Sequence, residues 1–446
     1  MKKEVDMLSG SLWSKIILFA LPVVTTIIVQ QLFNTADTAI IGKFGESGAL
    51  AAVGTNGEIV AMHVSLSAGL SIGTNVLISR YIGAGKKENI RTAVTSSMLT
   101  AVIFGIALAI VGDIAALPLL KLIYTPQDIL HQAVTYLRIY CISIPFLMIY
   151  DFGSAIFRAR GDSKRPLVAL MISGTINILL NLIFVVVFHM NVVGVALATV
   201  IATAFSAAIV VYWLFRECDE YRLMLHGFDK SYFIQIIRIG IPAALQGVVF
   251  CFANIFVQAS VNQFGSDTVA GSAIAMTFEY FAYYAITSFG QTATTFISQN
   301  YAAGNFSRCR KTLRICLVFA FLSCAMITVP LTIFRYQASG IFTSDSQEIE
   351  ASCTRIILIL IFEPICSFYE IPASAMRGFG YSAIPAVETI IGTCLFRIVW
   401  IFTVFRYFET LQSLYIVFPI TWVVTSVIVV ISYGMLKRFK KLYNER

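Results

Sequence analysis

One carboxylate, Asp37, stands inside a long apolar stretch of the sequence. A charged side chain at the middle of a bilayer costs about 2.5–3.5 kcal/mol on insertion scales, so an acid in such a place is a functional candidate by default. Asn177 and Asn181 stand four residues apart in another apolar stretch and therefore share one helix face. Because a helix rises about 1.5 Å per residue, both amides are expected at a depth similar to that of Asp37.

Two more polar residues are expected beside this carboxylate. Thr199 lies at a similar depth near the start of its own apolar stretch, and Gln30 lies two helical turns before Asp37 on the same face. Carboxylate, amide and hydroxyl oxygens together are suitable ligands for Na⁺, or they form a proton site with hydrogen-bonding neighbours. The sequence therefore predicts a cation-coupling site at Asp37. In the alternative interpretation, the amides and the hydroxyl only hydrogen-bond between helices.

Weaker candidates for substrate contacts are acids and one tyrosine in the other apolar stretches: Glu58, Glu279, Tyr283, Glu363 and Glu370. Tyr283 belongs to an aromatic cluster, and aromatic faces beside carboxylates suit flat cationic ligands. Glu58 and Glu279 occupy matching places in the two halves of the chain, so a structural role at helix ends stays open for them. We expect Glu363 and Arg397 to form a buried ion pair, because either charge alone would be costly.

No constellation for enzymatic chemistry accompanies these residues, and we predict that the protein is not an enzyme. The segment Gly83-Ala-Gly85-Lys86-Lys87 lacks the first glycine and the final Ser or Thr of a phosphate-binding loop. The four histidines have no metal-ligand spacing, and most of the nine cysteines lie in apolar stretches as small buried hydrophobes. We therefore expect no cofactor and no metal other than a coupling ion, Na⁺ or H⁺.

Long apolar helices must position the candidate residues. The chain has 446 residues, of which 58% are hydrophobic and only 13% are charged, and a single soluble core stops growing at about 250–300 residues. The apolar stretches are too long for barrel strands and have the length that a helix needs to cross a bilayer. The sequence predicts an all-α polytopic membrane protein with twelve spans, near residues 15–42, 49–74, 90–117, 132–156, 166–188, 192–215, 237–263, 270–298, 312–334, 353–376, 384–405 and 411–436.

Basic residues set the expected orientation. Of the 32 Lys and Arg residues, we assign 25 to the amino terminus, the carboxyl terminus and alternate loops, which leaves 7 for the other side. By the positive-inside rule both termini are then cytoplasmic, in a multi-pass protein of the bacterial cytoplasmic (inner) membrane. The formal net charge of +8 follows from these loops and does not indicate nucleic-acid binding.

The two halves of the chain repeat each other. The segment Ile78–Gly85 reappears as Ile297–Gly304 at a shift of 219, and Pro22 matches Pro242 at a shift of 220. Each half contains six predicted spans, so both halves insert the same way up, which is common among transporters. We expect an N-terminal lobe over residues 1–215, a cytoplasmic linker over 216–236 and a C-terminal lobe over 237–446, around a central cavity.

These motifs resemble the multidrug and toxic compound extrusion (MATE) family, in its bacterial DinF-like branch. The resemblance covers nearly the whole chain, and its motifs are Leu21-Pro22, Asp37-Thr-Ala-Ile-Ile-Gly42, Ile78–Gly85, Arg158-Ala-Arg-Gly161, Asn177-Ile-Leu-Leu-Asn181, Gly240-Ile-Pro242 and Met376-Arg377-Gly378. It implies a cation-coupled antiporter that exports bulky, often cationic organic compounds by alternating access. It also implies that Asp37, Asn177 and Thr199 are cation ligands. Many relatives have an acid where this chain has Asn181, and some have one at the position of Phe250.

Two other functions stay open beside this one. A flippase for lipid-linked saccharides is the main alternative, but such relatives often have fourteen spans and an arginine-rich cavity, whereas here almost all arginines are expected in loops. A membrane-embedded enzyme would need a catalytic constellation that the sequence lacks. We expect a protein that works as a monomer on small organic substrates in the lipid bilayer.

Overall fold

A computed structural model describes residues 4–46, 48–123, 125–218, 220–224 and 227–439, and within these ranges the chain is helical without β-strands. The basic residues Lys2, Lys3, Lys440, Lys441 and Arg446, used above for orientation, lie outside the described residues. The chain forms two compact units, one of Met1–Val5 and Leu21–Ala244 and the other of Asp6–Ala20 and Leu245–Arg446. The lobe boundaries at 215 and 237 stay a prediction.

Two long helices contribute to both units. α1 (Leu12–Phe44) and α9 (Lys230–Val261) each pass from one unit to the other close to an internal proline, Pro22 and Pro242. A proline inside a helix removes one backbone hydrogen bond and favours a bend at that point. The remaining elements of the first unit are α2 (Ala49–Thr55), α3 (Gly57–Gly83), α4 (Lys87–Leu122), α5 (Gln127–Cys141), α6 (Ile144–Arg160), α7 (Lys164–Asn181), the π-helical segment η1 (Leu182–Val187) and α8 (Asn191–Phe215).

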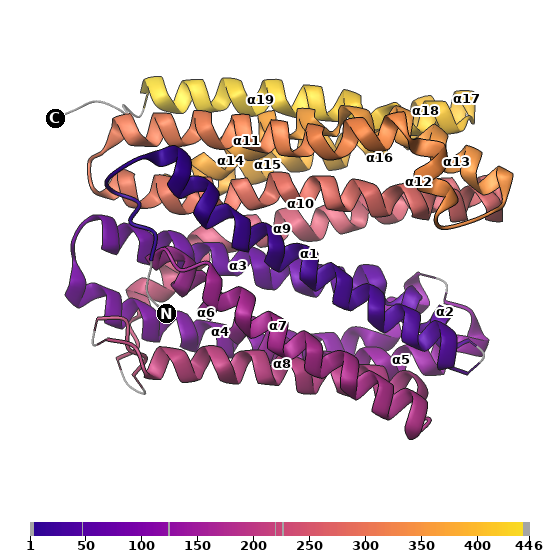
Figure 1. Ribbon diagram of the computed structural model, residues 1–446, viewed down its shortest axis with the longest axis horizontal. Helices are drawn as coiled ribbons and strands as arrows, with labels where there is room; N and C mark the ends of the chain where they lie inside the picture. Colours follow the sequence, from indigo (N-terminus) through magenta and orange to yellow (C-terminus); the bar gives the residue numbers. More distant parts are fainter. Residues whose placement is uncertain (1–3, 47, 124, 219, 225–226, 440–446) are drawn as a thin grey trace. The chain divides into compact units, whose positions relative to one another are not determined.

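The second unit has more irregular helices (Figure 1). Its α10 and α11 lie side by side along most of their length. Its elements after α9 are η2 (Asn262–Phe264), α10 (Ser266–Ala302), α11 (Phe306–Ile333), α12 (Arg335–Gly340), α13 (Ser346–Leu358), η3 (Leu360–Cys366), α14 (Ser367–Gly378), α15 (Ala383–Thr389), η4 (Ile390–Leu395), α16 (Phe396–Trp400), η5 (Ile401–Phe405), α17 (Arg406–Phe408), α18 (Leu411–Tyr415) and α19 (Val417–Phe439).

The helices have the length and composition of membrane spans. Ten helices of the described chain are long and apolar enough to cross a bilayer, and the bent pair α5 and α6, which meet at 44°, makes an eleventh span. α10 has 37 residues and is long enough to cross, although it is not one of these apolar helices. Counted with α10, the spans agree with the predicted twelve, and the predicted all-α polytopic fold is confirmed.

Proline breaks the same span in both halves. α5 ends at Cys141 and α6 begins at Ile144, directly before Pro145, while in the second unit the 3-10 segment η3 interrupts the span around Pro364. Because proline has no N–H group, the regular helix ends before it. The two prolines stand 219 residues apart, so the break is part of the repeat and lies in a span that holds several buried polar residues.

Glycine permits close helix packing inside the first unit. A Cβ atom at Gly69 would collide with the backbone of Ala244, and one at Gly73 would collide with the carbonyl oxygen of Ile236. The first part of α9 therefore lies directly against α3. In lipid the hydrophobic effect does not drive helices together. Close packing at small residues supplies the attraction instead.

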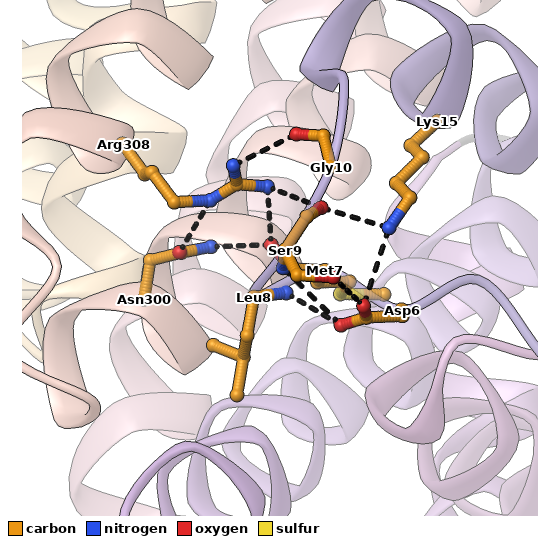
Figure 2. A network of polar contacts seen from close by, with 8 residues as sticks. All are labelled: Asp6, Met7, Leu8, Ser9, Gly10, Lys15, Asn300 and Arg308. Atoms are coloured by element: carbon orange, nitrogen blue, oxygen red, sulfur yellow. Dashed lines mark hydrogen bonds and ion pairs between the residues drawn. The ribbon is translucent and has the colours of Figure 1, made fainter.

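The segment before α1 is anchored on the second unit (Figure 2). Arg308 donates hydrogen bonds to the carbonyl oxygens of Met7 (3.0 Å), Ser9 (3.0 Å) and Gly10 (2.9 Å), and Asn300 donates a further one to Met7 at 3.0 Å. A guanidinium group has five donors and can satisfy several backbone carbonyls at once. An arginine and an amide of the second unit thus fix a bent segment of backbone before α1.

Candidate functional site

Asp37 belongs to a small polar cluster in the first unit. Asn181 donates a hydrogen bond from Nδ2 to Oδ1 of Asp37 at 2.5 Å, and the same Nδ2 lies 3.4 Å from Oδ1 of Asn177. Both amides are buried and Asp37 is half-buried. The i, i+4 spacing predicted that Asn177 and Asn181 share a face. Asn181 contacts the predicted carboxylate, and Asn177 contacts Asn181.

The helix carrying these amides changes its winding directly after them. The α-helical part of α7 ends at Asn181, and the π-helical segment η1 follows at once. π-helical turns are rare and often occur at functional sites, because they reorient the side chains of one turn. The Oδ1 atom of Asn181 is buried without a hydrogen-bond partner in the described part of the chain. The cluster therefore offers oxygen atoms that a cation or a proton could use.

Two predicted members of this cluster are not joined to it by a hydrogen bond between described residues. Thr199 donates its hydroxyl hydrogen to the carbonyl oxygen of Val195 at 3.0 Å, in its own helix. Gln30 is half-buried on α1, two turns before Asp37. The contacts thus support a three-residue cluster of one carboxylate and two amides.

A second polar site lies wholly within the second unit. Glu279 of α10 and Arg355 of α13 form a two-point ion pair, with Nε to Oε1 at 2.7 Å and Nη2 to Oε2 at 2.9 Å. The third nitrogen of Arg355 donates to Oγ of Ser272 at 2.7 Å. Paired hydrogen bonds between a guanidinium and a carboxylate are among the strongest polar contacts in proteins. This pair is therefore internally satisfied.

The expected ion pair between Glu363 and Arg397 is absent, so that prediction is wrong. Each side chain is buried, with 3% and 1% of its surface exposed. Oε2 of Glu363 and Nη1 of Arg397 have no hydrogen-bond partner among the residues that the structure describes. Arg397 makes a weak contact from Nε to Thr421 at 3.4 Å and lies 4.1 Å from the ring centre of Phe418. Glu279, rather than Glu363, has an arginine partner, because Arg355 lies opposite it on α13.

These four charged residues line one cavity of about 80 Å³. This volume is room for several water molecules, but sites for drug-sized compounds have about 300–1,000 Å³. The predicted residues Glu279, Tyr283 and Glu363 are all in its wall. Its other lining residues are Phe250, Asn254, Val257, Gln258, Met276, Tyr280, Arg355, Cys366, Tyr369, Arg397, Phe418 and Trp422.

The remaining predicted contacts lie elsewhere. Glu58 is in the first turn of α3, where a carboxylate favours the helix amino terminus. Glu370 accepts hydrogen bonds from Arg377 at 3.1 Å and from Ser374 at 3.3 Å, and it is absent from the cavity lining. Both carboxylates therefore have surroundings in which a structural role suffices.

Sequence reasoning named Arg397 as a buried arginine but predicted no role for Arg355 or Arg377 in the second unit. All three are buried, with at most 6% of their surface exposed. The expectation that almost all arginines lie in loops is therefore wrong. The signal for Arg397 is its place in an apolar stretch with no other charged residue between Glu388 and Arg406.

Comparison with known proteins assigns the family. A family model described as MatE matches residues 22–183 and 242–403, once in each half of the chain and at a shift of 220. The chain belongs to the MATE family. Members of this family are transporters and not enzymes, so the family predicted from the motifs is confirmed.

Several relatives of this MATE protein are similar over most of their length. The protein named probable multidrug resistance protein YoeA of Bacillus subtilis is 24% identical over 85% of this chain and 84% of its own. The probable multidrug resistance protein NorM of Thermotoga maritima is 25% identical over 89% and 86%. A solved structure, described as the outward-facing conformation of a multidrug resistance MATE family transporter, covers 100% of both chains with a TM-score of 0.91 and 23% identity.

Proposed function

We propose that this MATE protein is an antiporter that exports small organic compounds and is driven by H⁺ or Na⁺ through Asp37. The observation that carries the proposal is the contact of Asp37 with Asn181 inside a membrane span. The buried amide oxygen of Asn181 has no hydrogen-bond partner among the described residues. Burial disfavours the ionised form of a carboxyl group, so such a group readily exchanges a proton or takes a cation. The names of its relatives, which are multidrug resistance proteins, support organic substrates.

The proposed cycle is alternating access, in which the two units open the pathway to one side and then to the other. The crossing of α1 and α9 between the units near Pro22 and Pro242 supports it, because a proline supplies a point where a helix can bend. A similar protein has been solved in a state described as outward-facing. Asp37 and Pro22 lie on the same helix, α1. A change of charge at Asp37 therefore acts on the helix that can bend at Pro22.

The experiment is ion-driven export of a fluorescent cationic dye by the purified protein in vesicles, with Na⁺ and proton gradients imposed separately. Asp37→Asn should abolish the accumulation of dye against its own concentration gradient. The vesicles carry the ion gradient that drives the unmodified protein. Asp113→Asn is the matched control, because this acid is also in a span of the first unit but forms a half-exposed contact with Arg138 at 3.6 Å. Gradient-dependent export that is equal in all three proteins would place the coupling carboxylate elsewhere.

The flippase alternative has one observation in its favour, the two buried arginines that line the cavity of the second unit. A lipid-linked saccharide carries a pyrophosphate group, which arginines bind well. However, Arg355 is already neutralised by Glu279, and a cavity of about 80 Å³ leaves little room for such a group. Vesicles that also contain a fluorescent lipid-linked saccharide test this alternative directly, since movement of this lipid without dye export would favour it.

We further propose that both termini are cytoplasmic, in the bacterial inner membrane. Cys218, the exposed cysteine among the nine, follows α8 in the predicted cytoplasmic linker. A membrane-impermeant maleimide should label Cys218 in inside-out vesicles and leave it unlabelled in intact cells. Cysteines placed at Lys86 and Lys311 should behave in the same way, and labelling of these sites from outside would reverse the orientation.

A further inference from the structure

The first part of α1 is packed as an element of the second unit. The chain passes from the second unit to the first close to Pro22. Before that point Ile16 and Phe19 are completely buried, and the ring of Phe19 meets that of Phe296 in α10 edge-on at 5.6 Å. This part of α1 cannot slide or turn without disturbing the packing of the second unit.

Arg308 adds a polar anchor directly ahead of this helix (Figure 2). Its guanidinium group donates to the carbonyl oxygens of Met7, Ser9 and Gly10 at 2.9–3.0 Å, and its Nε donates to Oδ1 of Asn300 at 3.1 Å. All three nitrogens of the group therefore have an acceptor. Because the donors lie in one rigid plane, they fix the direction of the backbone as well as its position.

The other helix that contributes to both units, α9, is also anchored at its start. Its first part belongs to the first unit and the rest to the second. At a shift of 219 Arg308 corresponds to Asn89, which donates from its amide to the hydroxyl of Tyr232 at 2.7 Å. The hydroxyl of Ser96 accepts a hydrogen bond from the backbone N–H of Asp229 at 3.0 Å. The anchor is thus a feature of the repeat and does not arise from the chain terminus alone.

The two anchors differ in chemical type. The anchor of α9 consists of neutral amide and hydroxyl groups, whereas that of α1 is a charged guanidinium group with four hydrogen bonds. Hydrogen bonds of an ionised donor are about twice as strong as neutral ones. The stronger anchor therefore holds the helix that also contains Asp37, the acid proposed above for coupling.

A held start changes how α1 responds to an event at Asp37. Asp37 lies 15 residues after Pro22, which is about 22 Å along a helix. A helix that is free at its start can answer a local change by moving as one rigid rod. A helix that is held there must deform between the two points, and the site beside a proline is the weakest because a backbone hydrogen bond is missing.

We propose that Arg308 is a positioning residue for transport, which holds the start of α1 on the second unit so that a change at Asp37 bends the helix at Pro22. This inference rests on the proposed function and adds a fixed point to it. Arg308 is absent from the lining of the cavity and from the Asp37 cluster. Its loss should therefore slow export without changing what the protein binds.

Distances between spin labels in the purified full-length protein test the anchor directly. Cysteines at the exposed positions Ser11 and Lys311 report on the anchor, and cysteines at Ser11 and Thr38 report on the bend. Cys218→Ser removes the exposed native thiol. Asp37→Asn, which imitates the protonated acid, should shift the distance from Ser11 to Thr38 and leave that from Ser11 to Lys311 unchanged.

The same measurement in Arg308→Gln should give the opposite pattern. The distance from Ser11 to Lys311 should become broad, and Asp37→Asn should no longer shift the distance from Ser11 to Thr38. A distance from Ser11 to Lys311 that changes with Asp37→Asn while Arg308 is present would overturn the proposal, because the start of α1 would then not be held.

Export of the fluorescent cationic dye measures the consequence for transport. Arg308→Gln should lower the initial rate at saturating dye about tenfold, the effect of one hydrogen bond to a charged group on a rate. The Kd and the stoichiometry of dye binding in calorimetry should stay unchanged. Binding sites lost in step with the rate would show that Arg308 only supports folding, and an unchanged rate in the folded variant would also overturn the proposal.

A conservative variant and a matched control complete the test. Arg308→Lys keeps the charge but lacks the planar fork, so it should restore part of the rate, and it covers the case in which Arg308→Gln does not fold. Arg314→Gln should export at the full rate, since Arg314 is exposed on the same helix, α11. A rate that falls equally in Arg314→Gln would assign the effect to the charge of this helix and contradict the anchor.

The outcome for Asp37→Asn separates this inference from the proposed function. Full export by Asp37→Asn, together with slow export and a broad distance from Ser11 to Lys311 in Arg308→Gln, would remove Asp37 from the mechanism and keep the anchor. Abolished export in Asp37→Asn, with full export in Arg308→Gln, would keep the coupling acid and overturn the anchor.

Discussion

At the site of the first unit the carboxylate of Asp37 accepts a hydrogen bond from an amide, whereas the cavity of the second unit contains two acids and two arginines. The repeat relates the two sites position by position. At shifts of 219 or 220, Asp37 corresponds to Val257, Tyr136 to Arg355, Ile144 to Glu363, Ile178 to Arg397 and Thr199 to Phe418. All five second-unit residues line the cavity. Positions that the repeat relates thus have side chains of different chemical type in the two units.

This difference shows which features the repeat has kept. The break before a proline is present in both halves, at Pro145 and at Pro364, because it shapes the backbone. The charged side chains beside these breaks have changed, because they determine what binds. An acid without a basic partner suits a coupling cation, whereas in the second unit Glu279 is already paired with Arg355.

The largest expected effect separates the two sites by their role in coupling. Asp37→Asn should remove the whole ion-driven concentration ratio, whereas Glu363→Gln should leave a gradient-dependent ratio for a cationic dye. One charge moved through 100 mV supplies about 2.3 kcal/mol, which corresponds to a ratio of about 50-fold. Dye accumulation in vesicles at a fixed membrane potential measures both variants. Loss of coupling in Glu363→Gln alone would reverse the comparison.

The free energy of unfolding should fall more for a variant of the second site than for one of the first. Arg355→Gln leaves Glu279 buried without its partner, and breaking a buried ion pair costs about 3–5 kcal/mol. Asp37→Asn removes no such pair, and an Asn can keep one hydrogen bond with Asn181, so we expect a change below about 1 kcal/mol. Thermal unfolding of each variant in detergent tests this. The double variant Glu279→Gln with Arg355→Gln should recover part of the loss, and a fully additive loss would show that the pair does not couple.

A smaller difference is expected at two acids that the repeat relates at a shift of 219. Asp151 accepts a hydrogen bond from the hydroxyl of Ser67 at 2.5 Å, while Glu370 accepts one from the guanidinium of Arg377 at 3.1 Å. Both bonds involve a carboxylate, but only the second joins two opposite charges. Breaking a buried ion pair costs about 3–5 kcal/mol, against about 1.5–3 kcal/mol for one hydrogen bond to a charged group. Glu370→Gln should therefore lower Tm more than Asp151→Asn. An equal or reversed order would mean that the ion pair adds nothing to stability.

The sequence predicted the first site better than the second for a physical reason. Asn177 and Asn181 stand one helical turn apart, so their shared face follows from local geometry, and a lone acid in an apolar stretch is conspicuous. Glu279 and Arg355 are 76 residues apart, and nothing local indicates that α13 lies opposite α10. Most of the twelve spans follow from apolar length, but the π-helical turns around Arg397 depend on packing and have no sequence signal.

The smallest effect concerns the amino-terminal segment, where neighbouring residues are anchored on different units. Val5 donates a backbone hydrogen bond to Gly161 of the first unit at 3.0 Å, whereas Asp6 begins the segment held by Arg308 of the second. A hydrogen bond from Ser9, with smaller contributions from the Leu8 amide and Lys15, lowers the pKa of Asp6 from 3.8 to about 2. A lowered pKa in the folded state means that the ionised carboxylate stabilises the fold.

This contribution should be complete above pH 3.8, decrease as the pH falls, and vanish near pH 2, where the folded protein also binds the proton. More than half of the Asp6 side chain is exposed, so the effect stays below about 1 kcal/mol. Tm of Asp6→Asn should therefore lie slightly below that of the unmodified protein at pH 5–7, and the gap should close between pH 4 and pH 2. Ser9→Ala removes the main hydrogen bond and should reproduce most of the gap. A gap that stayed constant down to pH 2 would show that the side-chain shape, and not its charge, fixes this segment on the second unit.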